Sequence, residues 1–259
     1  MSASTPVDNK AQPATVALFV SDIHLSPRMP KTADAFFRFL DEEARNTRQL
    51  YLLGDIFEYW AGDDDIDDPF NRKLVDALRA LSDKGVQLYW MAGNRDFLAG
   101  EAFAQASGVN LLPDPYVARI GGQRVLLLHG DAQCIDDRDY MAFRSQVRNP
   151  EWQRAFLAKP LVERKAIIEG MREGSRDAQR DKPMAIMDVN HLAIERLFTE
   201  HQVNLMIHGH THRPDTHRTE AGTRYVLPDW DFDHVPLRGG WLSIDLLGDI
   251  QSHQSQSLR

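Results

Sequence analysis

Short apolar runs recur along the chain, and several of them end at a polar cluster that contains glycine. Their residues are mostly aliphatic or aromatic, and each run is only three to five residues long. Buried β-strands have this length and composition, whereas helices need longer periodic stretches. We therefore predict strands at residues 16–20, 50–53, 87–91, 125–128 and 205–207.

Between these runs the apolar residues follow a helical spacing. Residues 33–44, 74–81 and 188–200 each place their apolar side chains on one face of a helix. Strands that alternate with helices indicate an α/β sheet that is at least partly parallel. Two late runs, 224–227 and 241–246, look like strands without helices that complete a second sheet. The pattern predicts a two-sheet α/β sandwich.

Residues 138–182 interrupt this alternation. They contain no convincing strand, and Asn149-Pro150 is typical of a helix start. Eleven Lys/Arg against seven Asp/Glu give this segment +4, so the remainder of the chain carries −12. We interpret the segment as an inserted, basic and apolar helical cap over the active site. A surface helical insertion with solvated charges is the alternative.

Length and composition indicate one soluble catalytic domain. The chain has 259 residues, of which 42% are hydrophobic, so a single core over residues 14–250 is expected. The polar tails, residues 1–13 and 251–259, are expected to be disordered. A net charge of −8 argues against binding to nucleic acid, and no obligate protein partner is evident.

Cysteine usage and hydropathy indicate a cytoplasmic protein. The single cysteine, Cys134, excludes an internal disulfide and fits a reducing compartment. Neither a signal peptide nor an apolar run of about 20 residues is visible, so we expect at most peripheral contact with a membrane.

Residues that commonly bind metals follow five of the predicted strands directly. In α/β sheets, ligands bind at the carboxyl ends of the strands, where the loops meet. Five strand ends that each offer oxygen or nitrogen ligands therefore predict a common site, although each motif alone is weak. The predicted metal ligands are Asp22, His24, Asp55, Asn94, His129, His210 and His212.

The types and number of these ligands indicate two divalent cations. Carboxylate, amide and imidazole groups suit Mn²⁺, Fe²⁺ or Zn²⁺, and seven ligands suit two sites that share one carboxylate. Two such ions stabilise the attacking and leaving oxygens of a phosphoryl displacement and acidify water to supply a nucleophile. The pattern therefore predicts a phosphohydrolase.

The order DxH, GD, GN, a later His and GHxH resembles the calcineurin-like metallophosphoesterases. The resemblance implies the same two-sheet sandwich. It also implies that Asp22, His24, Asp55 and His212 hold the first metal. Asp55, as the bridging ligand, would hold the second metal with Asn94, His129 and His210.

One position departs from the general family pattern. The residue after the GN asparagine is usually His, but here it is Arg95. Arginine cannot donate a proton at physiological pH, but it can clamp phosphate oxygens bidentately. This suits a leaving group that is already a stable anion, such as a phosphate released from a pyrophosphate. The alternative is that Arg95 only pairs with a nearby Asp.

Longer stretches, including GDIFEYWAGDDD, GNRDFL and IHGHTHRP, resemble one subfamily, the UDP-2,3-diacylglucosamine diphosphatases of lipid A biosynthesis. This resemblance implies hydrolysis of a lipid-linked UDP-sugar at its pyrophosphate, usually with Mn²⁺, at the cytoplasmic face of the inner membrane. It implies catalytic roles for Asp55 and Arg95. The implied substrate contacts are Asn94, Arg95, Asp137, Tyr140, Arg172, Ser175, Gln179 (commonly Asn in the subfamily), Lys182 and His210.

The cap fits this substrate, because apolar side chains could receive acyl chains and basic ones could face phosphates or an anionic membrane surface. A pyrophosphatase for another nucleotide-linked substrate and a catalytically silent scaffold are the alternatives. The acidic run 63–65 could bind a cation or be solvated. Asp96 and Asp131 are expected to support neighbouring ligands, Asp96 through a group such as His24.

Overall fold

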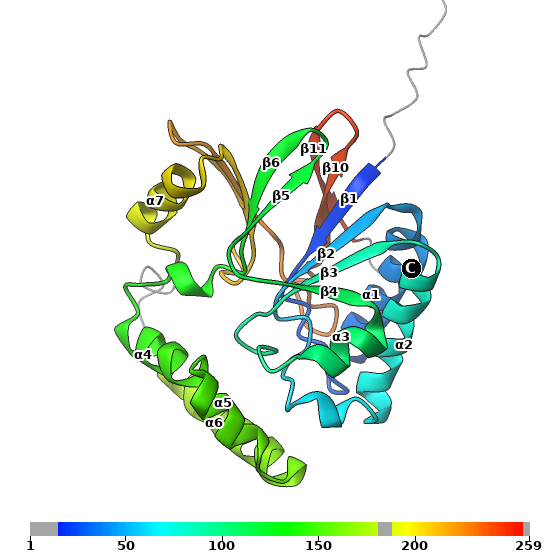
Figure 1. The fold of residues 1–259 in the computed structure, drawn as a ribbon, viewed down its shortest axis with the longest axis vertical. Helices are drawn as coiled ribbons and strands as arrows, with labels where there is room; N and C mark the ends of the chain where they lie inside the picture. Colours follow the sequence, from blue (N-terminus) through cyan, green and yellow to red (C-terminus); the bar gives the residue numbers. More distant parts are fainter. Residues whose placement is uncertain (1–14, 181–187, 256–259) are drawn as a thin grey trace, which may run out of the picture.

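The structure is a computed structural model that describes residues 15–180 and 188–255. Two mixed β-sheets pack face to face, with helices on both outer faces, and three further helices extend beyond one end of the sandwich (Figure 1). The predicted two-sheet α/β sandwich with an inserted helical cap is therefore confirmed.

The first sheet has six strands. Its central strands β1 (Thr15–Val20), β2 (Gln49–Leu53), β3 (Gln87–Met91) and β4 (Val109–Leu112) are parallel. Beside β1 lie the antiparallel strands β10 (Gly240–Asp245) and β11 (Ile250–Gln254). The spatial order is β11-β10-β1-β2-β3-β4.

The second sheet has five strands in the order β5-β6-β7-β9-β8. The strands β6 (Gln123–Leu127), β7 (Leu205–His208) and β9 (Thr223–Val226) are parallel. The outer strands β5 (Tyr116–Ile120) and β8 (Asp215–Arg218) are antiparallel to their neighbours.

Alternate residues of each central strand serve different cores, because successive side chains of a strand point to opposite faces. In β1, Phe19 is buried between the two sheets, and Val20 is buried against the outer helices. These outer helices are α1 (Pro30–Glu42), α2 (Pro69–Asp83) and α3 (Glu101–Ser107). The helix α7 (His191–His201) covers the second sheet. Burial on both faces explains the unbroken apolar runs in the sequence.

The segment that breaks the strand–helix alternation forms the helices α4 (Arg138–Val147), α5 (Pro150–Leu157) and α6 (Leu161–Arg180). As predicted, Asn149 begins α5: its side-chain oxygen accepts hydrogen bonds from the backbone N–H groups of Glu151 (2.8 Å) and Trp152 (3.3 Å). Three short 3₁₀ turns, Ala44–Asn46, Asp63–Asp65 and Asp131–Gln133, complete the described elements.

The prediction of a disordered carboxyl-terminal tail is wrong for residues 251–254. They belong to β11, which pairs with β10 from Gly240–Gln254 to Ile244–Ile250. β11 has a polar sequence because it is an edge strand with half of its surface in solvent, and hydropathy does not reveal such strands. The expected amino-terminal tail, residues 1–13, lies outside the described residues. In the described part of the chain, no helix is both long and apolar enough to cross a bilayer.

Candidate metal centre and substrate cavity

Five of the seven predicted ligands have a backbone conformation that is unfavourable for residues with a Cβ atom. Asp22, His24, Asp55, His210 and His212 have φ angles between 53° and 68°. Among the described residues only one other non-glycine residue has a positive φ. Strain of this kind costs about 1–3 kcal/mol per residue and concentrates at functional sites. The sharp turn after each strand aims these side chains at one point.

Asp22, His24 and His212 form the first group. The imidazole Nε2 atoms of His24 and His212 lie 3.2 Å apart, and His212 Nε2 lies 3.5 Å from Asp22 Oδ1. The other oxygen of Asp22 accepts hydrogen bonds from the Ser21 hydroxyl and from the His210 backbone N–H. Asp22 Oδ1 is buried without a hydrogen-bond partner.

Asp55, Asn94 and His129 form the second group. His129 Nδ1 donates to the carbonyl oxygen of Leu53 at 2.9 Å, so a neutral His129 ring carries no proton on Nε2. That bare nitrogen lies 3.1 Å from Asn94 Oδ1 and 3.7 Å from Asp55 Oδ1. Three atoms with lone pairs thus converge. A Cβ atom on Gly93 would collide with the Asp55 carboxylate, so glycine is required there.

Both groups fit a divalent cation. Ligand atoms of Asp22, His24 and His212 lie within 4.8 Å of one another, as do those of Asp22, Asp55 and His129. Converging lone pairs repel one another unless a cation lies between them, and a buried carboxylate oxygen without a partner is costly. Carboxylate, amide and imidazole ligands suit a divalent metal of intermediate hardness.

His210 completes the site from the second sheet. Its ring lies 5.1 Å from that of His129 and 5.9 Å from that of Tyr140, measured between centroids. The Tyr140 hydroxyl donates to Asp131 at 2.7 Å, and Arg144 Nε lies 2.8 Å from the same carboxylate. Asp131 therefore supports the site by holding α4 of the cap against it.

Asp96 does not contact His24. Its carboxylate accepts hydrogen bonds from the backbone N–H groups of Asp55 (3.3 Å), Ile56 (2.9 Å) and Gly93 (2.8 Å). The expectation for Asp96 is therefore corrected, because this carboxylate ties the loop after β2 to the loop after β3. Backbone donors that stabilise a buried carboxylate in this way fix the spacing of the loops.

Histidine contacts set the charge of the carboxylates. Burial alone would raise the pKa of Asp22, but the close contact with His212 and its charge hold that pKa well below its usual range. Burial also opposes ionisation of Glu58, yet its contact with His24 and the nearby charges of Arg95 and Arg172 lower its pKa to about 2. Both carboxylates are therefore ionised at neutral pH and favour a cation nearby.

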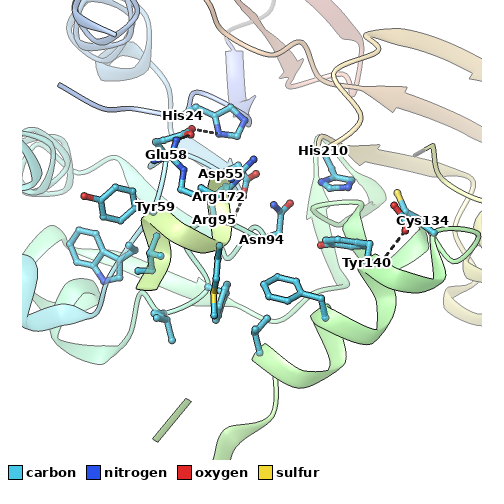
Figure 2. Close-up of a pocket in the computed structure, with 18 of the residues that line it drawn as sticks. His24, Asp55, Glu58, Tyr59, Asn94, Arg95, Cys134, Tyr140, Arg172 and His210 are labelled. Atoms are coloured by element: carbon cyan, nitrogen blue, oxygen red, sulfur yellow. Dashed lines mark hydrogen bonds and ion pairs between the residues drawn. The ribbon is translucent and has the colours of Figure 1, made fainter. Parts of the chain in front are cut away.

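A cavity of about 700 Å³ opens onto these ligands, and its wall changes from polar to apolar. Figure 2 shows His24, Glu58, Asp55 and Arg95 on one side and His210 with Tyr140 on the other. Farther from the ligands, the lining is aromatic and aliphatic and comes largely from the cap. These apolar lining residues include Phe97, Leu98, Phe143, Val147, Trp152, Phe156, Ile168 and Met171.

Most predicted substrate contacts line this cavity. Asn94, Arg95, Asp137, Tyr140, Arg172 and His210 all face it. Arg95 Nε is buried without a hydrogen-bond partner among the described residues. The backbone of Ser175 and Gln179 belongs to α6, but their side chains lie outside the described residues, as does the whole of Lys182.

The acidic run 63–65 has roles that neither sequence interpretation foresaw. Asp63 accepts hydrogen bonds from Trp60 Nε1 and from the backbone N–H groups of Gly100 and Phe103, all at 3.0 Å. Asp64 pairs with Arg164, and Asp65 lies 2.7 Å from Lys165 Nζ. The run therefore supports α3 and anchors the cap, because the two basic partners, Arg164 and Lys165, both belong to α6.

Two further carboxylates, Glu58 and Asp229, contact the first group from outside. Glu58 Oε2 lies 3.2 Å from His24 Nδ1, and Asp229 Oδ2 lies 3.6 Å from His212 Nδ1. The only feature of the sequence that could have indicated a role for Glu58 is its position, three residues after Asp55 in the same loop. Nothing in the sequence links Asp229 to His212, because the fold alone brings the two segments together.

Comparison with known proteins shows the family of the chain. The family model described as calcineurin-like phosphoesterase matches residues 16–214, which include all seven predicted ligands. The chain belongs to the calcineurin-like phosphoesterase family. The resemblance noted in the sequence is thus confirmed.

Curated relatives of this phosphoesterase match it over most of their length. It is 49% identical over 226 residues to the UDP-2,3-diacylglucosamine hydrolase of Aromatoleum aromaticum. This alignment covers 86% of this chain and 92% of the relative. The proteins of that name from Chromohalobacter salexigens and Escherichia coli K12 are each 48% identical over 217 residues. These two alignments cover 82% of this chain and 88% and 90% of the relatives, respectively.

Proposed function

We propose that this phosphoesterase hydrolyses UDP-2,3-diacylglucosamine to UMP and 2,3-diacylglucosamine 1-phosphate. The observation that carries the proposal is a single cavity that joins a cluster of metal-type ligands to a long apolar wall. Polar groups at one end suit a pyrophosphate, and the apolar wall suits acyl chains. Relatives that share nearly half of its residues are named for this substrate.

The reaction adds water across the pyrophosphate, so that one phosphorus gains the oxygen of water and the other leaves as a phosphate monoester. We assign Asp22, His24, Asp55 and His212 to one divalent ion and Asp55, Asn94, His129 and His210 to another, with Mn²⁺ as the expected metal. When bound, such ions polarise phosphoryl oxygens and lower the pKa of water.

The protein's own residues position the substrate. Arg95 is held beside the ligands because its backbone N–H donates to Asp55 Oδ1 at 2.8 Å and its carbonyl accepts from Trp60 N–H at 3.1 Å. Its guanidinium, with that of Arg172, can clamp phosphate oxygens and stabilise the charge of the leaving phosphate. Apolar cap side chains exclude water from the far end of the cavity.

Product analysis tests this function. The purified protein is incubated with UDP-2,3-diacylglucosamine and Mn²⁺, and the products are identified by mass spectrometry. We expect UMP and the lipid phosphate, and we expect a chelator or Asp55→Ala to stop their formation. Equal turnover of UDP-glucosamine without acyl chains would favour the rival, a pyrophosphatase for another nucleotide-linked substrate. No metal-dependent hydrolysis at all would favour a silent scaffold.

We also propose that the cap contacts an anionic membrane surface, as at the cytoplasmic face of the inner membrane. Exposed apolar side chains of the cap support this, notably Val162, which is 78% exposed, and Leu157, which is 40% exposed. Basic residues near such a surface contribute about 1 kcal/mol each. Sedimentation with vesicles tests the proposal, and it fails if anionic vesicles bind the protein no better than neutral ones.

A further inference from the structure

Glu58 connects a predicted metal ligand to the cap. One of its carboxylate oxygens lies 3.2 Å from His24 Nδ1, and the other pairs with the Arg172 guanidinium. Both partners are largely buried, with 18% and 14% of their side chains exposed. Glu58 and His24 come from the loops after β2 and β1, whereas Arg172 comes from α6 (Figure 2).

The carboxylate lies beside Nδ1 of the His24 ring at ion-pair distance. A proton on Nδ1 that faces Glu58 leaves the Nε2 lone pair directed at His212 Nε2, 3.2 Å away. Carboxylates that orient a metal-binding histidine in this way also raise its basicity as a ligand. Glu58 therefore has the geometry of a residue that positions His24 without contacting a metal itself.

Asp229 has the corresponding place behind His212 and provides an internal comparison. It lies 3.6 Å from His212 Nδ1 and accepts a hydrogen bond from Arg238 Nε at 2.9 Å. Each imidazole of the first group thus has a carboxylate behind it, and each carboxylate has an arginine. The difference is the origin of the arginine: Arg238 belongs to the same segment as Asp229 and does not line the cavity.

Arg172 lines the cavity and is held from several sides. Its guanidinium lies over the ring of Tyr59, 5.7 Å from the centroid, and 3.3 Å from Glu169. Its Nε is buried without a hydrogen-bond partner among the described residues, so the group retains a donor for a ligand. Glu58 is the residue that connects the Arg172 guanidinium to the metal-type ligands.

We propose that Glu58 is a positioning residue that couples the orientation of His24 to that of Arg172, so that metal binding and substrate binding depend on one carboxylate. The proposal rests on the proposed function, because Arg172 is assigned to a substrate phosphate. Its physical basis is that one ionised group fixes two side chains from separate parts of the fold. A glutamine cannot replace it, because the amide offers an acceptor to only one of the two partners.

The test compares Glu58→Gln with Asp229→Asn, two isosteric changes behind neighbouring imidazoles. Mn²⁺ binding to the metal-free protein is measured by calorimetry, without substrate. We expect both variants to bind Mn²⁺ about 10- to 100-fold more weakly than the natural protein. Mn²⁺ affinity of Glu58→Gln equal to that of the natural protein would overturn the proposal.

The second measurement is KM for the lipid substrate at saturating Mn²⁺. We expect Glu58→Gln to raise KM about fivefold or more, and Asp229→Asn to leave it within about twofold. Combining Glu58→Gln with Arg172→Ala should raise KM no further than Arg172→Ala alone, because both changes remove the same contact. Equal KM values for Glu58→Gln and Asp229→Asn, or effects that multiply, would refute the coupling.

Two controls keep the outcome interpretable. If the natural protein does not hydrolyse the lipid substrate, the proposed function fails, while calorimetry still decides whether Glu58 supports the metal ligand. If thermal unfolding shows that Glu58→Gln is not folded, Glu58→Asp replaces it. The shorter carboxylate cannot reach both partners, so the same losses of affinity are expected.

Discussion

Arg164 joins the helical cap to the loop that carries Asp55. Its side chain is almost completely buried, with 1% of its surface exposed. Its Nε donates to the carbonyl oxygen of Lys159 at 3.0 Å, and a second guanidinium nitrogen donates to that of Ala61. A third contact pairs it with Asp64. Arg164→Met keeps the apolar stem and removes all three contacts.

The structure sets the size of the expected loss. The buried hydrogen bond to Ala61 and the part-buried one to Lys159 come from a charged donor and contribute about 1.5–3 kcal/mol each. Asp64 is 60% exposed, so its ion pair adds little. Arg164→Met should therefore reduce the free energy of unfolding by about 3–6 kcal/mol. Because the contacts with Ala61 and Asp64 join the cap to the loop after β2, part of this loss should appear as opening of α5 and α6.

Urea denaturation measures the global loss, and amide hydrogen exchange locates it. Arg154→Met is a matched control, because Arg154 on α5 is 76% exposed and its only described ion-pair partner, Glu151, lies 4.0 Å away. The control should change the unfolding free energy by less than about 0.5 kcal/mol. An Arg164→Met protein as stable as Arg154→Met, with unchanged exchange in α5 and α6, would refute the reasoning.

Gly209, Cys134 and His253 each allow a further test of the structure. A Cβ atom on Gly209 would collide with the side chains of Ser21 and Asp22, so Gly209→Ala should weaken Mn²⁺ binding at least ~10-fold by calorimetry; unchanged binding would contradict this. Burial raises the pKa of Cys134 to about 12, so alkylation at about pH 8 should be ~10³-fold slower in the native than in the urea-unfolded protein; similar rates would exclude the shift. Burial lowers the pKa of His253, so protonation opposes folding. Stability from this group is complete above its ordinary pKa and is lost as pH falls from there through the lowered pKa of the folded state. His253→Phe should therefore flatten the change in urea midpoint between about pH 8 and pH 5.5, and an unchanged slope would count against it.

The sequence was sufficient to predict the central strands and the ligands that follow them. Strands buried on both faces have unbroken apolar runs, as at Leu50–Leu53, and therefore stand out in the sequence. Edge strands do not, because half of their surface is solvated and their residues are mixed. This is why the sequence predicts a tail at residues 251–254 and no strand at Val109–Leu112.

The candidate site divides in the same way. Asp22, Asp55 and His210 could be found because each follows a strand in a short motif, and local chemistry of that kind is written in consecutive residues. The partners Glu58 and Asp229 could not be assigned, because a carboxylate supports a particular histidine only when folding brings it there. His212 and Asp229 are connected through two strands of the second sheet.

The order of residues alone therefore indicates the type of chemistry, because it shows which ligands are available, how they follow one another, and that an apolar and basic insertion accompanies them. The contact of Arg172 of the cap with Glu58 beside His24, and the contacts of Asp64 and Asp65 with the cap, become visible only in the folded protein. The physical reason is that strand and ligand patterns depend on near neighbours in the chain. Contacts between α6 and the loop after β2 depend on the packing of segments about a hundred residues apart.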